Sequence, residues 1–364
     1  MRGPKDRDFV ETEDGFIWCV VGYLHPHDRY TAYLKYTPAE TGRWKRARDE
    51  GEDKRETIYY HRELEYYHVR NVAKTLEFLN VHYPRYVGFD QTQNLTFSFV
   101  PRDAVIRYYR PEERLQAILA APADPLEKDV EVLVSLLVAA GGPYTTAFGI
   151  TGSILLSMHD PSFSDIDLLV YGREATARVR AAVSGLRGGP IREVAQDRMN
   201  RWRSETAARF GLGPDDIAHL EARRWNYFQF RDRYVSVHPT RRDDEIDETY
   251  GQHTYRALGV ATIEAQVMDA EDSIFLPARY ALRDVVVREG RSLRPFDKAQ
   301  GGLRSGQAWE IATLVSFEGL YCQAADPGDR IVARGVVEQV DDGVCRLVVG
   351  AAGLPDGGYL KLRV

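Results

Sequence analysis

One segment of this chain, residues 148–171, constrains its fold more than any other. Its first part is apolar as far as Ile150, and Gly152-Ser153 follows after Thr151. A turn signal then precedes a second apolar run, which opens with Asp165-Ile166-Asp167. This order predicts a strand at 146–150, a helix over about 152–159, and a strand at 165–171. Side chains two positions apart on a strand point to the same face, so we expect the two aspartates to lie side by side.

The residue types in this segment suit phosphate and metal chemistry. Two ionised carboxylates on one face repel each other unless a cation lies between them. Such a pair offers the hard oxygen ligands that Mg²⁺ or Mn²⁺ prefers. Gly152 allows a phosphate to approach the backbone, and the N–H groups at a helix start favour an anion, with the Ser153 hydroxyl as a further donor. A phosphate cradle beside a metal-binding acid pair is the minimum equipment for phosphoryl or nucleotidyl transfer.

Each part of this segment also has a simpler interpretation. Asp165 and Asp167 are typical of an exposed strand face or of carboxylates that cap a turn, and Ser153 is a common helix N-cap. Either half of the pattern is therefore weak alone. The spacing between Gly152-Ser153 and the acids favours a functional site.

As a unit, the segment resembles the signature of the DNA polymerase β nucleotidyltransferase superfamily. That signature is a strand, Gly-Ser at the following helix start, and an acid–apolar–acid triplet on the next strand. The whole chain also resembles a group of uncharacterised archaeal predicted nucleotidyltransferases. The phrases that carry this likeness are Val20-Val21-Gly22-Tyr23-Leu24-His25-Pro26, Gly149-Ile150-Thr151-Gly152-Ser153-Ile154 and Ser316-Phe317-Glu318-Gly319-Leu320-Tyr321.

The resemblance implies a role for each residue of the motif. Asp165 and Asp167 would bind Mg²⁺ or Mn²⁺ bridging the phosphates of a nucleoside triphosphate. Gly152 and Ser153, together with Ser164 directly before the acids, would bind the nucleotide. An acceptor hydroxyl would attack the α-phosphorus, and pyrophosphate would leave.

The chain departs from the family pattern at the third acid, which members often carry on a neighbouring strand. The strand expected to carry it is Tyr234–His238, which contains no Asp or Glu. His238 occupies a suitable position and is our candidate catalytic residue, with Asp243 and Asp244 following in a loop. His238 is equally typical of a strand-end histidine bonded to backbone.

The coarse pattern predicts a multidomain α+β architecture. We expect an N-terminal α+β domain at 1–110, a helical connector at 111–140 and a polymerase β-type nucleotidyltransferase domain, a mixed sheet with helices, at 141–259. An all-β barrel or sandwich follows at 260–364. Within these, we expect a hairpin over 16–36, a loop at 41–56, a helix near 64–79 and a strand at 273–276.

Charge and composition limit the partners. The net charge of −6 argues against a general nucleic-acid binder. Residues 173–242, however, contain 15 Arg and no Lys against 8 Asp plus Glu, which suits a triphosphate or polyanionic acceptor as well as solvated helix faces. There is no long apolar run and no signal-type N-terminus, so we expect a cytoplasmic protein with no membrane partner.

Two functions remain open at this point. The first is a Mg²⁺-dependent nucleotidyltransferase that acts on a hydroxyl of RNA, a protein or a small molecule. The second is a catalytically degenerate module of the same fold that binds nucleotide or RNA without turnover. The intact Gly-Ser and acid pair favour the first, and the missing third acid favours the second.

Overall fold

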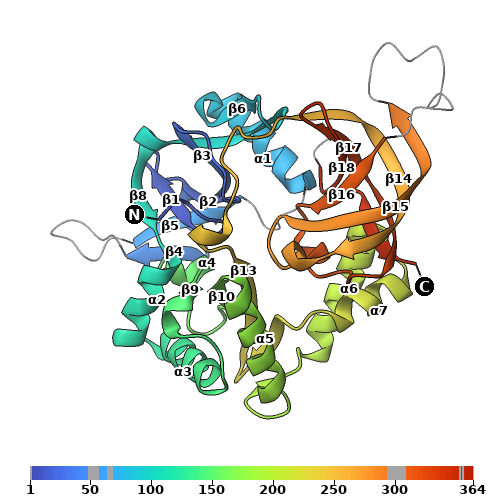
Figure 1. Cartoon of the computed structure of the whole chain (residues 1–364). Helices are drawn as coiled ribbons and strands as arrows, with labels where there is room; N and C mark the ends of the chain where they lie inside the picture. Colours follow the sequence, from blue (N-terminus) through green and yellow to red (C-terminus); the bar gives the residue numbers. More distant parts are fainter. Residues whose placement is uncertain are drawn as a thin grey trace. The chain divides into compact units, whose positions relative to one another are not determined.

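The computed structural model describes residues 2–47, 57–63, 69–292, 309–351, 354 and 356–363. Over these residues the chain is α+β, with several sheets that include mixed ones (Figure 1). It divides into two compact units. The first is Met1–Glu65, Ser98–Met199 and Arg224–Asp247, and the second is Tyr66–Phe97, Asn200–Arg223 and Glu248–Val364. Each unit is therefore assembled from segments that are distant in the sequence.

The first unit contains an antiparallel sheet built largely from N-terminal residues. Its strands lie in the order β4-β5-β3-β2-β1-β8, and the end of β7 also pairs with β3. Their bounds are β1 Phe9–Thr12, β2 Ile17–Val20, β3 Arg29–Ala39, β4 Trp44–Ala47, β5 Thr57–Arg62, β7 Leu95–Pro101 and β8 Val105–Tyr109. The hairpin predicted over 16–36 is confirmed, since β2 and β3 pair antiparallel.

Strand β4 lies in the stretch that we predict as a loop, and for residues 44–47 that prediction is wrong. The strand forms because Trp44 pairs across the ladder with Tyr60 of β5, a cross-strand aromatic contact that local composition does not reveal. Residues 48–56 of the predicted loop lie outside the described residues.

The second sheet of this unit is mixed and has the order β11-β12-β13-β10-β9. Strands β10 and β13 are parallel, and the other neighbours are antiparallel. The bounds are β9 Phe148–Ile150, β10 Ile166–Tyr171, β11 Ile191–Arg192, β12 Tyr227–Phe230 and β13 Arg233–Thr240. Helices α2 (Pro111–Ala120), α3 (Pro125–Ala139) and α5 (Arg173–Leu186) share a hydrophobic core with it.

Helix α3 shows why these helices form where they do. Pro125 occupies the first turn, and the Asp124 carboxylate accepts hydrogen bonds from the N–H groups of Leu126 and Glu127, which caps the helix. Its apolar side chains recur at helical spacing and are fully buried; they are Val130, Leu133, Val134 and Leu137.

The helix predicted over about 152–159 is wrong in length, because α4 spans only Gly152–Leu155. Ser157 adopts a left-handed conformation with φ of 53°, which an α-helix does not allow. Leu155, Leu156 and Met158 are all buried against β2, β3 and β5 of the N-terminal sheet. Burial of consecutive residues on more than one side, rather than along one helical stripe, ends the helix after a single turn.

The N-terminal segment crosses from one sheet of the unit to the other. Arg2 pairs with buried Asp8 at 2.7 Å and also with Glu112 of α2. The Lys5 ammonium donates to the Arg241 carbonyl at 3.0 Å, just beyond β13. These contacts place the residues between them, including Arg7, beside β10 and β13.

The second unit is built around a closed β-barrel in which most neighbouring strands are antiparallel and β16 and β18 are parallel. Its strands have the order β14-β15-β16-β18-β17-β19, and the added pairing of β14 with β17 closes the ring. The bounds are β14 Tyr255–Asp269, β15 Ala278–Ser292, β16 Ile311–Ser316, β17 Arg330–Val340, β18 Cys345–Val349 and β19 Tyr359–Leu362. The strand predicted at 273–276 is wrong, since a 3₁₀ turn occupies 271–274.

Three helices and a short strand complete the second unit: α1 (Val69–His82), α6 (Gln196–Phe210, which begins in the first unit), α7 (Pro214–Ala222) and β6 (Val87–Asp90). Phe210, Ile217 and Leu220 of α6 and α7 are packed into the core of the barrel. Helix α1 agrees with the predicted helix near 64–79, of which 64–68 lie outside the described residues. In the described part of the chain, no helix is both long and apolar enough to cross a membrane.

The core assignment of the mixed sheet can be tested by comparing two isoleucines of the first unit. Ile150 of β9 is 0% exposed and Ile106 of β8 is 65% exposed. Ile150→Ala should lower the free energy of unfolding by about 2–5 kcal/mol, because it leaves a cavity. Ile106→Ala should cost no more than about 1 kcal/mol, the range of strand propensity. Urea denaturation of the two variants measures both, and equal losses would contradict the burial described.

Candidate functional site

The backbone ladder of β9 and β10 holds the Gly-Ser turn against the acid pair. Ile150 pairs with Leu168, and beyond the end of β9 the Thr151 N–H donates to the Asp167 carbonyl at 2.9 Å. The chain then turns into α4 at Gly152. The start of α4 is therefore fixed beside Asp167 by main-chain hydrogen bonds and does not depend on side-chain contacts.

Gly152 is required by geometry at this point. Its φ is +67°, and a Cβ there would lie 2.7 Å from Asp167 Oδ2, well inside van der Waals contact. The N–H groups of Gly152, Ser153 and Ile154 belong to the first turn of α4, where a helix provides them with no carbonyl partner. Because α4 is a single turn, anion binding here would rest on these local N–H groups and not on a long helix dipole.

The two aspartates lie on the face of the sheet opposite the hydrophobic core. Ile166 and Leu168, between and after them, are fully buried. The carboxyl side chains of Asp165 and Asp167 are 39% and 37% exposed. The predicted acid pair is thus half-exposed on one face, within reach of solvent and of a ligand.

Strand β13 places Ser236 and His238 beside Asp167. Asp167 is opposite Ser236 in the parallel ladder, and the Ser236 hydroxyl donates to Asp167 Oδ1. The His238 Nε2 is 2.8 Å from the Ser236 Oγ and 4.0 Å from Asp167 Oδ1. Since the single hydroxyl proton goes to the carboxylate, Nε2 of His238 carries the proton that binds Ser236.

These contacts set the charges of the group. Burial and the charge of Arg7 lower the pKa of His238 to about 4, so its imidazole is neutral near pH 7. Burial alone would raise the pKa of Asp167, but His238, Ser236 and Arg7 together hold it below its usual value. Asp167 is therefore ionised and His238 uncharged at neutral pH.

The expected third acid is replaced on β13 by this serine and histidine. Asp243 and Asp244, the alternatives beyond the strand, are engaged elsewhere: Asp243 pairs with Lys5 at 2.5 Å and Asp244 with Arg242 at 2.7 Å. Ser164 is buried, and its hydroxyl accepts the Asp160 N–H at 2.9 Å inside the loop. The structure thus brings together Gly152, Ser153 and Asp167 with His238, and leaves Ser164 in a loop-stabilising position.

Two basic residues near Asp167 were not identified from the sequence. Arg7 reaches this place because its carbonyl accepts the Thr151 hydroxyl at 2.8 Å. Lys35 of β3 is buried, and burial with the charge of Arg62 lowers its pKa to about 7. A lysine within a strand of otherwise apolar and aromatic residues was the available signal for Lys35. Arg7 is one of several charged residues near the N-terminus, and nothing local distinguishes it.

Asp165 is paired with an arginine that is itself held by stacked rings. Arg198 of α6 donates to the Asp165 carboxylate at 2.8 Å, with its guanidinium carbon 3.6 Å from the centre of the Tyr234 ring. Tyr234 stacks on Tyr227 with centroids 6.0 Å apart, and Arg224 covers Tyr227 at 3.9 Å. This four-layer stack fixes the guanidinium on the acid pair.

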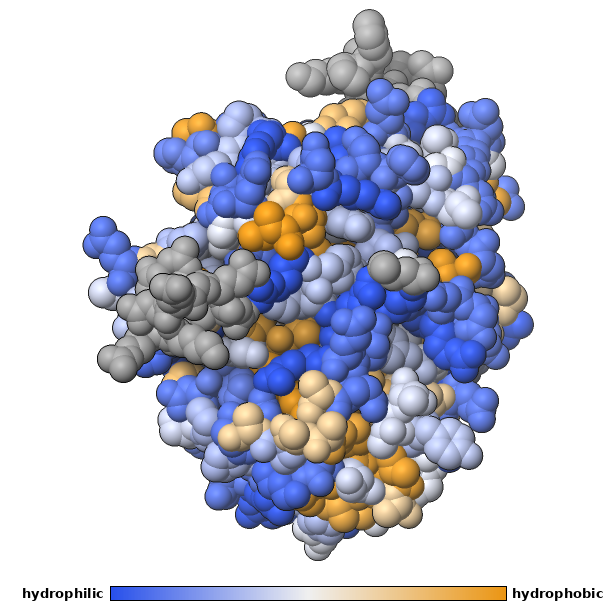
Figure 2. All heavy atoms as spheres, turned by 90° about the vertical axis from the view of Figure 1, so that its left-hand side faces the viewer, coloured by the Kyte–Doolittle hydropathy of each residue, from blue (hydrophilic) through white to orange (hydrophobic). Residues whose placement is uncertain are grey.

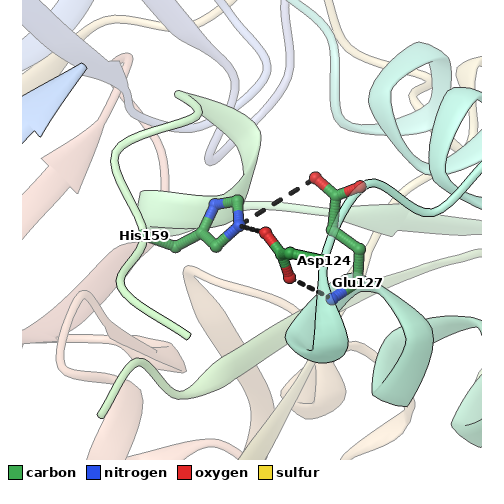
Figure 3. A group of neighbouring side chains, drawn as sticks. All are labelled: Asp124, Glu127 and His159. Atoms are coloured by element: carbon green, nitrogen blue, oxygen red, sulfur yellow. Dashed lines mark hydrogen bonds and ion pairs between the residues drawn. The ribbon is translucent and has the colours of Figure 1, made fainter. Parts of the chain in front are cut away.

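A separate group of potential metal ligands consists of Asp124, Glu127 and His159 (Figure 3). The His159 Nε2 points toward Asp124, at 2.7 Å, and lies 3.9 Å from Glu127. However, Asp124 caps α3, and Glu127 accepts from Arg114 and from the Ala123 N–H at 2.7 Å. With a guanidinium already bound to Glu127, the group connects α2, α3 and the segment after α4 and is best explained as structural.

Comparison with known proteins gives one full-length relative. The chain is 27% identical over 367 residues to a protein of Methanocaldococcus jannaschii described as "Uncharacterized protein MJ1086", and the match covers 98% of both chains. No family model matches the chain, and no solved structure matches it. The likeness to an archaeal protein is thus established along the whole length, while membership of the nucleotidyltransferase superfamily stays a prediction.

The pKa of His238 makes a testable contribution to acid stability. Because the folded pKa of about 4 lies below the ordinary 6.5, the unfolded chain binds this proton first as the pH falls. The stability that the neutral His238 imidazole contributes is fully present above pH 6.5 and is lost as the pH falls toward 4. Between pH 7 and pH 4, the free energy of unfolding of His238→Gln should therefore fall by about 3 kcal/mol less than that of the parent. Urea denaturation at the two pH values measures this difference. An unchanged slope in His238→Gln would contradict the neutral histidine.

Proposed function

We propose that this protein is a Mg²⁺-dependent nucleotidyltransferase, which moves a nucleoside monophosphate from a nucleoside triphosphate to a hydroxyl acceptor and releases pyrophosphate. The observation that carries this proposal is the contact between the start of α4 and Asp167, where a Cβ at position 152 has no room. This contact supports a site in which the first-turn N–H groups of α4 lie next to the Asp167 carboxylate. The mixed sheet with its helices is compatible with the polymerase β-type domain layout.

The donor atoms suit the metal. Asp165 and Asp167 are half-exposed carboxylates on one face, and they would hold Mg²⁺ or Mn²⁺, which take one or two protein carboxylates and complete their shells with phosphate and water. The bound ion would neutralise phosphate charge and orient the triphosphate. In this protein, the N–H groups of Gly152 and Ser153 would hold the outer phosphates.

His238 can replace the third acid as a base. Its pKa of about 4 is close to that of an ordinary aspartate, so a neutral histidine there has the basicity of the carboxylate that it replaces. With Nε2 donating to Ser236, Nδ1 of the neutral ring carries no proton and would be the nitrogen that accepts one. The substitution removes one negative charge from the site while keeping a proton acceptor.

Arg198 must leave Asp165 when the metal binds. A guanidinium and a divalent cation compete for the same carboxylate oxygens, and the triphosphate offers the released arginine a new anionic partner. Arg7 and Lys35 add positive charge on the Asp167 side.

A second candidate function is favoured by one observation, the absence of a carboxylate on β13. Ser236 and His238 occupy its place, so the domain could bind metal and nucleotide without turnover. Both functions require the same nucleotide site. Transfer of label from a nucleoside triphosphate labelled at the α-phosphate distinguishes them, since only the enzyme gives a labelled acceptor.

Calorimetric titration with each of the four nucleoside triphosphates, with and without Mg²⁺, tests the nucleotide site. We expect selective binding that requires the metal. The double variant Asp165→Asn/Asp167→Asn should weaken binding at least about tenfold, because it removes both charges that attract the cation. Asp232→Asn, a fully exposed acid of the same unit, is the matched control and should bind as the parent does. Absence of binding under every condition would sink the proposal.

The competition between Arg198 and the metal predicts effects of opposite sign. Arg198→Ala should bind Mn²⁺ alone about two- to fivefold more tightly, the strength of a half-exposed ion pair, as measured by electron paramagnetic resonance. The same variant should bind the metal–triphosphate complex more weakly, because a phosphate partner is lost. Arg201→Ala, exposed on the same helix, should change neither. A merely structural Arg198 would move both affinities in the same direction.

A further inference from the structure

The loop before the acid pair exposes an aromatic ring. Phe163 lies two residues before Asp165 in the segment between α4 and β10, and it is 37% exposed. Neighbouring Ser164 is buried and Pro161 accepts a hydrogen bond from Arg233, so the loop is anchored on both sides of Phe163. The ring is thus held at the surface next to the predicted metal ligands.

Edge strand β4 of the N-terminal sheet brings a second ring and an arginine to Phe163. The guanidinium carbon of Arg43 lies 3.8 Å from the centre of the Phe163 ring. Trp44 meets Phe163 edge-on, with centroids 6.5 Å apart, and rests on Tyr36 of β3 at 5.8 Å. Arg62 of β5 lies 5.6 Å from the Trp44 ring. We call Arg43, Trp44, Arg62 and Phe163 the aromatic platform.

The charge around the platform is positive. Among the described residues, neither Arg43 nor its neighbour Lys45 has a carboxylate within ion-pair distance, and both are exposed. Hydrogen bonds from Ser162 chiefly, and then the charges of Lys45 and Arg43, hold the pKa of Asp160 below its usual value, which places this strand beside the loop. Exposed cations beside exposed rings, with no ion-paired carboxylate within the described ranges, favour an anionic ligand with flat groups.

Single-stranded nucleic acid has this chemistry. Its bases stack on aromatic faces and on guanidinium planes, and its phosphates pair with arginine and lysine. A duplex hides its base faces and suits the platform less. Figure 2 shows that, on the face turned to the viewer, hydrophobic side chains lie in several groups among hydrophilic ones.

We propose that the aromatic platform binds a single-stranded nucleic acid and presents its terminal hydroxyl to the acid pair as the acceptor. A base takes the position of the Arg43 guanidinium on Phe163, and the guanidinium moves to an adjacent phosphate. Only Ser164 separates Phe163 from Asp165, so their Cα atoms lie no more than about 7 Å apart, and a strand stacked on the Phe163 ring passes close to the first acid. The acceptor role rests on the proposed function, whereas the binding surface does not.

Fluorescence anisotropy of labelled ten-nucleotide oligouridine and oligothymidine, without metal or nucleotide, tests the surface directly. We expect both single strands to bind more tightly than a duplex of the same length, with affinity that falls as salt rises. Phe163→Ala and Arg43→Ala should each weaken binding about tenfold, the effect of losing one stacked base. Tyr144→Ala and Arg201→Ala, exposed residues of the same types elsewhere, are controls and should bind as the parent does.

A second readout separates stacking from loss of fold. Binding should quench tryptophan fluorescence, and Trp44→Phe, which keeps a ring on the platform, should remove that quenching while retaining binding. If the parent, Phe163→Ala and Arg43→Ala bound oligonucleotide equally well, the proposed binding surface would be overturned. Absence of single-strand binding at low salt would also overturn it and would point to a protein or small-molecule acceptor.

If the acid variants lost nucleotide–metal binding but still bound oligonucleotide, the proposed binding surface would be supported. Oligonucleotide binding without any nucleotide–metal binding in the parent would refute the proposed function alone.

Discussion

The close approach of Gly152 to Asp167 is the constraint on which the rest of the site depends. The main-chain bond from Thr151 to Asp167 and the β9–β10 ladder leave 2.7 Å between a Cβ at position 152 and the Asp167 carboxylate. A side chain at 152 would be strained by the left-handed backbone and would push the Asp167 carboxylate aside. The turn and the carboxylate are thus held close together by the main chain, an arrangement that suits the proposed phosphate site.

Charge balance explains the other features of the site. Two carboxylates on one face need positive charge, and the protein supplies it with Arg198 on Asp165 and Arg7 near Asp167. A third carboxylate would require more positive charge nearby, whereas the neutral His238 and Ser236 require none. The stack that holds Arg198 on Tyr234 keeps that guanidinium in position without a second acid. The same face thus suits exchange of a protein cation for a metal and its anionic ligand.

The sequence predicted local elements well where one pattern determined them, and less well where distant segments did. The strands around the motif, the helical connector and the hairpin of β2 and β3 follow from periodicity and turn residues. The one-turn length of α4 does not, because packing against the N-terminal sheet ends it. Arg198 and the aromatic platform are contacts between distant segments, which spacing in one sequence cannot reveal.

The most direct test of the central claim is a crystal structure with Mn²⁺ and a non-hydrolysable nucleoside triphosphate, recorded with anomalous scattering. The account predicts an anomalous peak about 2.1 Å from oxygens of both Asp165 and Asp167. It also predicts phosphate oxygens at the N–H groups of Gly152 and Ser153, and Arg198 withdrawn from Asp165. A structure with nucleotide bound elsewhere, or with Arg198 still paired to Asp165 and no peak between the acids, would contradict it.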